Sequence, residues 1–101
     1  MTSEIIAIID LPASPLDAAA DFHSRELPRI RHHLSPADIV LVFKPAGQEH
    51  HAWRIAAVQG LARELAPIRV NAVSGDDEVA VDNAVMFLNE APGITGQLLA
   101  V

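Results

Sequence analysis

The 101-residue sequence contains no cysteine and no tyrosine. Without cysteine the chain can form no disulfide, no thiolate metal site and no thiol nucleophile, so a reducing compartment, the cytoplasm, is the expected location. Its aromatic residues are one tryptophan and three phenylalanines. Such a composition offers little surface on which nucleic-acid bases could stack.

Positive charge is also scarce. Seven lysines and arginines stand against thirteen acidic residues, which gives a net charge of −6, and no basic cluster occurs. This balance opposes a polyanionic partner and argues against nucleic-acid binding. The longest apolar runs have about five residues, far fewer than the ~20 that a membrane-spanning helix needs. Residues 1–4 also lack the basic and apolar stretches of a signal peptide.

Half of the residues are hydrophobic, and short apolar segments predict four strands. These segments cover residues 5–9, 39–43, 68–73 and 97–101. The segments at 5–9 and 39–43 are continuously apolar, which is typical of strands in a parallel sheet. For the segment at 5–9 the pattern predicts burial on both faces of the sheet.

Helical patterns separate the strands, at residues 15–34, 50–66 and 74–89. Ser14 and Ser74 are candidate N-caps, and Pro28 is expected to kink or split the first helix. Ser24 and Ser35 are read as turn or capping residues. The order βαβαβαβ predicts one α/β domain over residues 1–101, with a four-stranded parallel sheet and short connections.

The helix at 50–66 has two distinct faces. Val58, Leu61 and Leu65 form a stripe that faces the core, whereas a second face carries small residues beside one large ring. That face consists of Trp53, Ala56, Ala57 and Gly60. A glycine inside a helix costs about 1 kcal/mol relative to alanine, so we expect another backbone to approach this face closely, either in a second subunit or within the same monomer. In the helix at 15–34, the predicted apolar stripe consists of Ala20, His23, Leu27, Ile30 and Leu34.

Several segments, in order, resemble the short-chain dehydrogenase/reductase family. They are ELPRIR at 26–31, IVLVFKPAG at 39–47, AAVQGL at 56–61, RELAPIRVNAV at 63–73, AVMFL at 84–88 and ITGQLLAV at 94–101. The resemblance covers about residues 18–101. It implies that the chain corresponds to the C-terminal half of a Rossmann-like doubly wound fold. The family binds its dinucleotide at a glycine-rich turn in the N-terminal half of that fold.

The departures from that family concern its chemistry. The chain has no G-x-G-x-x-G segment, and Lys44 stands where the family has its catalytic serine. The family's Tyr-x-x-x-Lys aligns with His51 and Ile55, or after a shift of one residue with His50 and Arg54. Since the chain has no tyrosine, neither register restores the acid–base pair. These departures from the family imply no hydride transfer and no bound cofactor.

Five histidines raise the question of replacement chemistry: His23, His32, His33, His50 and His51. Neighbouring helical residues point about 100° apart, so an adjacent pair cannot easily chelate one metal ion. No metal site is predicted, and the histidines at helix ends are expected to be solvated. Lys44, His50 and His51 follow a predicted strand, and open α/β sheets bind ligands at such strand ends. These three residues are the candidates for a small-molecule or residual catalytic site.

Two functions follow from this sequence. The first is a non-catalytic, oligomeric structural or interaction subunit, because the resemblance implies that the helices at 16–34 and 50–66 form the family's main subunit contact. The partner would be a second copy of the chain or a full-length dehydrogenase. The predicted interface residues are His23, Leu27, Trp53, Ala56, Ala57, Gly60 and Glu64. The alternative is the small-molecule site at Lys44, His50 and His51.

Overall fold

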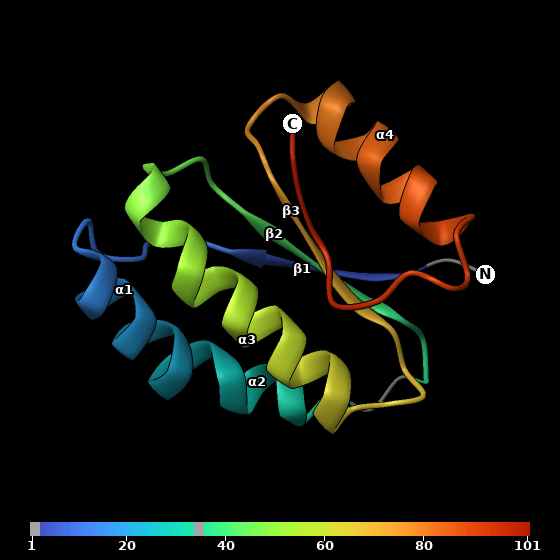
Figure 1. Ribbon diagram of the computed structural model, residues 1–101, viewed down its shortest axis with the longest axis horizontal. Helices are drawn as coiled ribbons and strands as arrows, with labels where there is room; N and C mark the ends of the chain where they lie inside the picture. Colours follow the sequence, from blue (N-terminus) through green and yellow to red (C-terminus); the bar gives the residue numbers. More distant parts are fainter. Residues whose placement is uncertain (1–2, 34–35) are drawn as a thin grey trace.

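The sheet has four parallel strands in the order β1-β2-β3-β4. In the computed structural model, which describes residues 3–33 and 36–101, these are β1 (Glu4–Ile8), β2 (Ile39–Phe43), β3 (Val70–Ser74) and β4 (Leu98–Ala100). Each strand pairs with the next in the sequence (Figure 1). The arrangement confirms the predicted α/β class and matches half of a Rossmann-like doubly wound fold.

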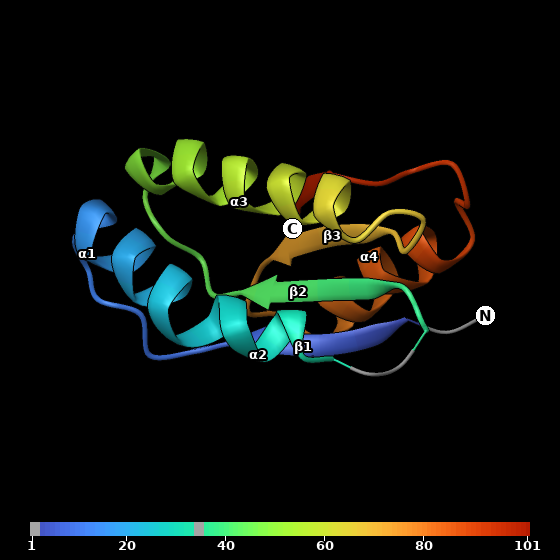
Figure 2. The same ribbon diagram turned by 90° about the horizontal axis from the view of Figure 1, so that it is seen from below.

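Helices cover both faces of the sheet. The bounds are α1 (Pro15–Asp21), α2 (Leu27–Arg31), α3 (His51–Glu64) and α4 (Glu78–Asn89). A short 3₁₀ turn, Gln48–His50, leads into α3. Figure 2 shows α1, α2 and α3 on one side of the sheet and α4 on the other. None of the helices in the described part of the chain is long and apolar enough to cross a membrane.

A π-helical turn, Phe22–Glu26, joins α1 to α2. Pro28 explains it, because proline has no N–H and its ring clashes with the carbonyl four residues before it. Here the Leu27 N–H bonds to the Phe22 carbonyl, five residues back. The expected interruption at Pro28 therefore takes the form of a π turn. Leu34 and Ser35, where the helix was expected to end, lie outside the described residues.

The π turn also changes which residues of this segment face the core. The buried residues are Ala18, Phe22, Glu26 and Ile30. The predicted stripe through Ala20 and His23 is wrong at both positions, because these residues are exposed. A regular 3.6-residue period does not hold across a π turn, and Phe22 fills the space that the sequence pattern assigned to His23.

Two apolar layers form on opposite faces of the sheet. The layer under α1, α2 and α3 is centred on Phe22, Leu41, Phe43 and Val58, and the layer under α4 on Val40, Val73, Val85 and Leu88. Successive strand residues supply opposite layers, as the alternation of side chains along a strand requires. β2 is covered on both faces, which explains why its apolar run is continuous.

β1 departs from this pattern. Ile6 and Ile8 are buried under α1 and α2, whereas Ile5 and Ile9 are 53% and 49% exposed. The prediction that this strand is covered on both faces is wrong, because α4 packs against the central strands of the opposite face and not against β1. β1 is an edge strand with one open face.

Ser74, a predicted N-cap, does not cap α4. It is the last residue of β3, and the cap is Asp77, whose carboxylate accepts a hydrogen bond from the Ala80 N–H at 3.1 Å. Two residues, Gly75 and Asp76, separate the strand from this cap. Aspartate is as good an N-cap as serine, so the sequence pattern could not distinguish the two positions.

Two polar side chains hold the amino edge of the sheet together. Arg69 binds the Asp38 carboxylate through Nε at 2.8 Å and donates from Nη1 to the carbonyls of Leu88, Ala91 and Ile94. Asn71 donates to the Ile94 carbonyl and accepts from the Gln97 N–H, both at 3.0 Å. The RVN segment therefore fixes the end of α4 and the loop that leads into β4.

Candidate functional site

A cavity of about 350 Å³ opens where β1 and β2 end. This carboxyl-edge cavity is lined by the loops that follow the two strands and by the start of α3. Its polar residues are Asp10, Lys44, Glu49, His50 and Arg54. The position matches the rule that open α/β sheets bind ligands at the carboxyl ends of their strands.

His50 is a buried wall of this cavity, with 6% of its surface exposed. Its Nδ1 faces the Trp53 indole Nε1 at 3.1 Å, and its Nε2 faces the Ala13 carbonyl at 3.0 Å. Because an indole N–H can only donate, Nδ1 accepts, and Nε2 carries the proton that is donated to Ala13. The expectation of a solvated histidine at a helix end is wrong for His50. Its imidazole is a fully bonded link between the α1 entry loop and α3.

Arg54 lies one helical turn further along α3 and is 7% exposed. Its guanidinium carbon lies 4.5 Å above the centre of the Phe43 ring. Nη1 makes a long hydrogen bond of 3.4 Å to Ser74 Oγ, while Nε is buried without a partner among the described residues. Burial lowers the pKa of Arg54 from its ordinary value. No carboxylate of the described residues forms an ion pair with it.

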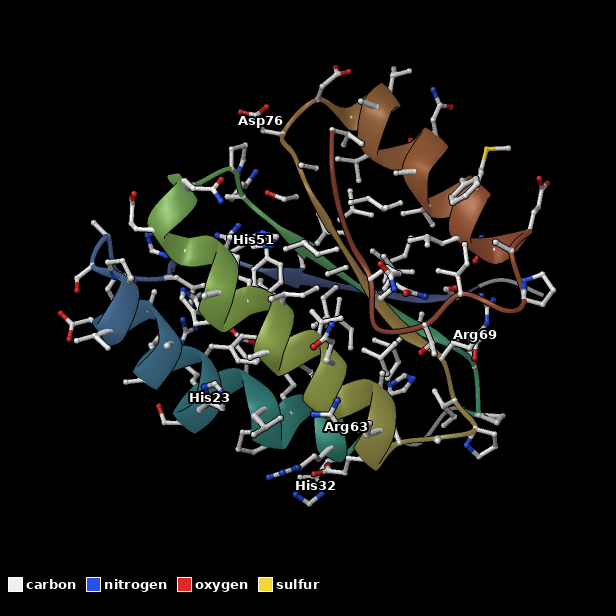
Figure 3. All side chains as sticks on the ribbon, in the orientation of Figure 1. His23, His32, His51, Arg63, Arg69 and Asp76 are labelled. Atoms are coloured by element: carbon white, nitrogen blue, oxygen red, sulfur yellow. The ribbon has the colours of Figure 1, made fainter. Side chains whose placement is uncertain are left out.

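A second, smaller cavity of about 120 Å³ lies beside the first, toward the ends of β3 and β4. The two cavities share the lining residues Ala46, Gly47, His50 and Arg54. The predicted trio is divided between them, since Lys44 lines only the first cavity and His51 only the second. Figure 3 shows His51 at this edge of the sheet.

The two alignments with the family's Tyr-x-x-x-Lys differ in where they place their side chains. His51 is exposed and Ile55 is half-buried, whereas His50 and Arg54 are both buried and face the cavities. In the alignment with His50 and Arg54, both side chains therefore face the cavities at the carboxyl edge. Sequence reasoning named Arg54 only as this alternative. An arginine four residues before Val58, and so on the core-facing side of α3, was the signal available in the pattern.

The predicted interface residues lie together at a different place. A groove of about 330 Å³ runs between the α1–α2 segment and α3. Its lining comprises His23, Leu27, Arg31, Trp53, Ala56, Ala57, Gly60, Leu61 and Glu64, and we call it the helical groove. All seven predicted interface residues are in this set. Figure 3 shows His23 on the α1–α2 side of the groove.

The helical groove is mostly apolar and has small residues along its α3 side. Ala56 is exposed, and nothing lies within 4 Å of the position that a Cβ atom would take at Gly60. Trp53 is half-buried, and its ring contacts Phe22 and Phe43 at centroid distances of 5.5 and 5.9 Å. The indole therefore belongs partly to the core and partly to the wall of the groove.

An ion pair joins the two sides of the helical groove. Arg31 donates from Nε and Nη2 to the two carboxylate oxygens of Glu64, each at 2.7 Å. The hydrogen bonds from Arg31 lower the pKa of Glu64 and raise that of Arg31. Both side chains are largely exposed, at 49% and 42%. Pairs of this kind contribute little to stability but hold two side chains in one geometry.

This pair predicts a pH dependence. Because the pKa of Glu64 is lowered in the folded protein, the pair stabilises the fold above the ordinary glutamate pKa and is lost as pH falls through the folded value. We expect wild type to exceed Glu64→Gln slightly in free energy of unfolding at neutral pH. The difference should shrink to nothing in acid, as measured by urea unfolding at several pH values. A difference that grew with acidity would contradict the assignment.

Metal chemistry finds no support in the described residues, which contain no group of three or more potential ligands that could hold a metal ion. His23 is held by its own helix, with Nδ1 2.7 Å from the Ala19 carbonyl. His32 projects from the molecule near the end of α2 (Figure 3). No two of the histidines labelled in that view converge on one point.

Comparison with known proteins identifies the family. A family model described as SDR-like, short chain dehydrogenase-like protein, matches residues 6–101. The chain matches no curated protein and no solved structure at a significant level. The family match begins in β1 and extends to the end of the chain, so it includes every strand, both cavities and the helical groove. The chain therefore belongs to the short-chain dehydrogenase-like family.

Proposed function

We propose that this protein is a non-catalytic association module of the short-chain dehydrogenase-like family, which forms a homodimer through the helical groove. The observation that carries the proposal is the groove itself. Its α3 side carries Trp53 beside the small residues Ala56, Ala57 and Gly60, and it leaves the Cβ direction of Gly60 open. Small residues on a helix allow a second helix to approach closely.

A different surface would be the free edge of β1, where an unpaired strand could add to another sheet. Two arginines partly occupy that edge. Arg29 donates to the Ala7 carbonyl at 3.2 Å, and Arg25 donates to the Ile9 carbonyl at 3.3 Å. Both arginines also pair with the buried carboxylate of Glu26. Charged side chains along an edge strand oppose pairing, so we favour the helical groove.

The composition of the carboxyl edge supports the non-catalytic part of the proposal. A hydride-transfer site of the resembled kind needs a phenol beside an ammonium group. This chain has no tyrosine, and His50, which faces the cavities, has both ring nitrogens engaged in hydrogen bonds. Lys44 is exposed and lines the same cavity. These residues supply no activated acid–base pair for that reaction.

Self-association should be tested with Ala56→Arg and not with a substitution of Trp53, because the indole contacts the core and its loss would also destabilise the monomer. Ala56 is exposed at the groove. By analytical ultracentrifugation we expect a wild-type dimer at micromolar concentration and a monomeric Ala56→Arg variant with unchanged circular dichroism. Burying an unpaired guanidinium in an apolar contact accounts for a loss of at least about 100-fold in affinity.

The matched control is Asn83→Arg, which adds the same charge to an exposed position of α4 on the other face of the sheet. It should dimerise like wild type. A wild-type chain that sediments as a monomer would contradict the homodimer, and one that then bound a full-length dehydrogenase would assign the groove to a heteromeric contact instead. A dimer that Ala56→Arg left intact would place the interface elsewhere.

A further inference from the structure

The carboxyl-edge cavity contains a buried arginine, Arg54, which lies outside the helical groove. Arg54 is more than nine-tenths buried, pairs with no described carboxylate and lines both cavities. Burying a charged group without a counter-ion is expensive, and buried charges in folded proteins are normally paired. The face of the Phe43 ring compensates the guanidinium only in part.

The hydrogen-bonding capacity of Arg54 is also largely unused. A guanidinium has five N–H donors in a planar fork. The described residues take one of them, at the long distance of 3.4 Å to Ser74 Oγ, and the buried Nε–H has no partner. Arg54 lies in the first turn of α3, where the partial positive charge of the helix end also favours an anion.

From this geometry we infer that the carboxyl-edge cavity binds a small organic monocarboxylate, with its two oxygens on the Arg54 guanidinium and a short apolar chain against the cavity wall. The fork of an arginine matches the two oxygens of a carboxylate. The rest of the wall is largely aliphatic. It includes Ile8, Leu11, Pro12, Ala13, Ala18 and Pro45.

The remaining charged groups of the cavity lie in exposed residues at its rim. Lys44 adds a second cation, whereas Asp10 and Glu49 are carboxylates that oppose an anion. The Glu49 carboxylate lies over Gly47, where an added Cβ atom would clash with it. With the buried position held by a single guanidinium and the rim carrying both signs of charge, a monoanion fits better than a phosphate dianion.

Trp53 provides the probe for this site, because it is the only tryptophan and its ring centre lies 5.8 Å from the Arg54 guanidinium carbon. Butyrate should change its fluorescence in a saturable way with a millimolar dissociation constant, at constant ionic strength. Butyramide, the neutral analogue, should produce no saturable change. Inorganic phosphate should bind at least about tenfold more weakly than butyrate. Equal responses to butyrate and butyramide, or tighter binding of phosphate, would overturn the assignment.

Arg54→Met keeps the length of the side chain and removes the charge, so butyrate affinity should fall at least about tenfold. The control is Arg63→Met, an exposed arginine on α3 that Figure 3 shows far from His51 and the carboxyl edge. Ala46→Phe gives a second test if Arg54→Met does not fold. Ala46 is exposed and lines both cavities, so a large ring there should block entry. Unchanged butyrate binding in Arg54→Met or in Ala46→Phe would overturn the proposal.

Discussion

Replacing Arg69 with methionine should lower the free energy of unfolding by about 3 kcal/mol, because hydrogen bonds from a charged group are worth about 1.5–3 kcal/mol each and several are lost together. The Arg69 guanidinium binds the Asp38 carboxylate and three main-chain carbonyls at the end of α4 and in the loop before β4. Its side chain is only 16% exposed. For a domain of this size the loss corresponds to a decrease of about 15 °C in melting temperature.

Chemical denaturation followed by circular dichroism measures this effect, with Arg63→Met as the control. Arg63 is exposed on α3, and its replacement should change stability by less than about 0.5 kcal/mol. Figure 3 shows the two arginines at separate positions, with Arg69 at the amino edge of the sheet. If both variants lost the same small amount, Arg69 would not be the clamp that joins α4 to β4.

The second large effect is expected at His50. His50→Leu should cost about 2 kcal/mol, because it leaves the Trp53 indole N–H and the Ala13 carbonyl without their partners in a partly buried place. The loss also separates the α1 entry loop from α3. The neighbouring His51 is exposed, so His51→Leu should change stability by less than about 0.5 kcal/mol.

Trp53 reports on this prediction independently of stability. Since its indole N–H donates to His50, its fluorescence emission should shift in folded His50→Leu and stay unchanged in His51→Leu. Equal destabilisation of the two variants would mean that His50 is as solvated as its neighbour. An unshifted emission spectrum in folded His50→Leu would mean that the hydrogen bond to Trp53 is not formed.

The strands and the helix pattern were predictable because they depend on local features. The apolar segments at 39–43 and 68–73 locate β2 and β3 to within one or two residues, and the ordered family-like segments indicated the fold and its topology. Pro28 predicted that the helix at 15–34 is interrupted, but it did not predict the form of the interruption. A π turn and a kink satisfy the same local constraint, and packing of Phe22 against Phe43 and Trp53 accompanies the one observed here.

The candidate surfaces were predictable to different degrees. The residues of the helical groove were recognisable because small residues repeat along one face of α3 at helical spacing. The residues of the carboxyl edge were harder to predict from the sequence. Whether His50 or His51 faces inward depends on the 3₁₀ turn that leads into α3. A difference of one residue rotates a side chain by about 100°, which exchanges a buried histidine for an exposed one.

By itself, then, the sequence determined that this is a parallel α/β domain of dehydrogenase-like ancestry without a tyrosine or a glycine-rich nucleotide loop. Composition, periodicity and ordered motifs are properties of the chain. The tertiary structure alone decided that β1 has an open face, that Arg69 and Asn71 hold the amino edge, and that Arg54 is buried without a counter-ion among the residues the structure describes. Each of these features depends on which residues far apart in the sequence come within a few ångströms of one another. The local sequence pattern does not determine those distances.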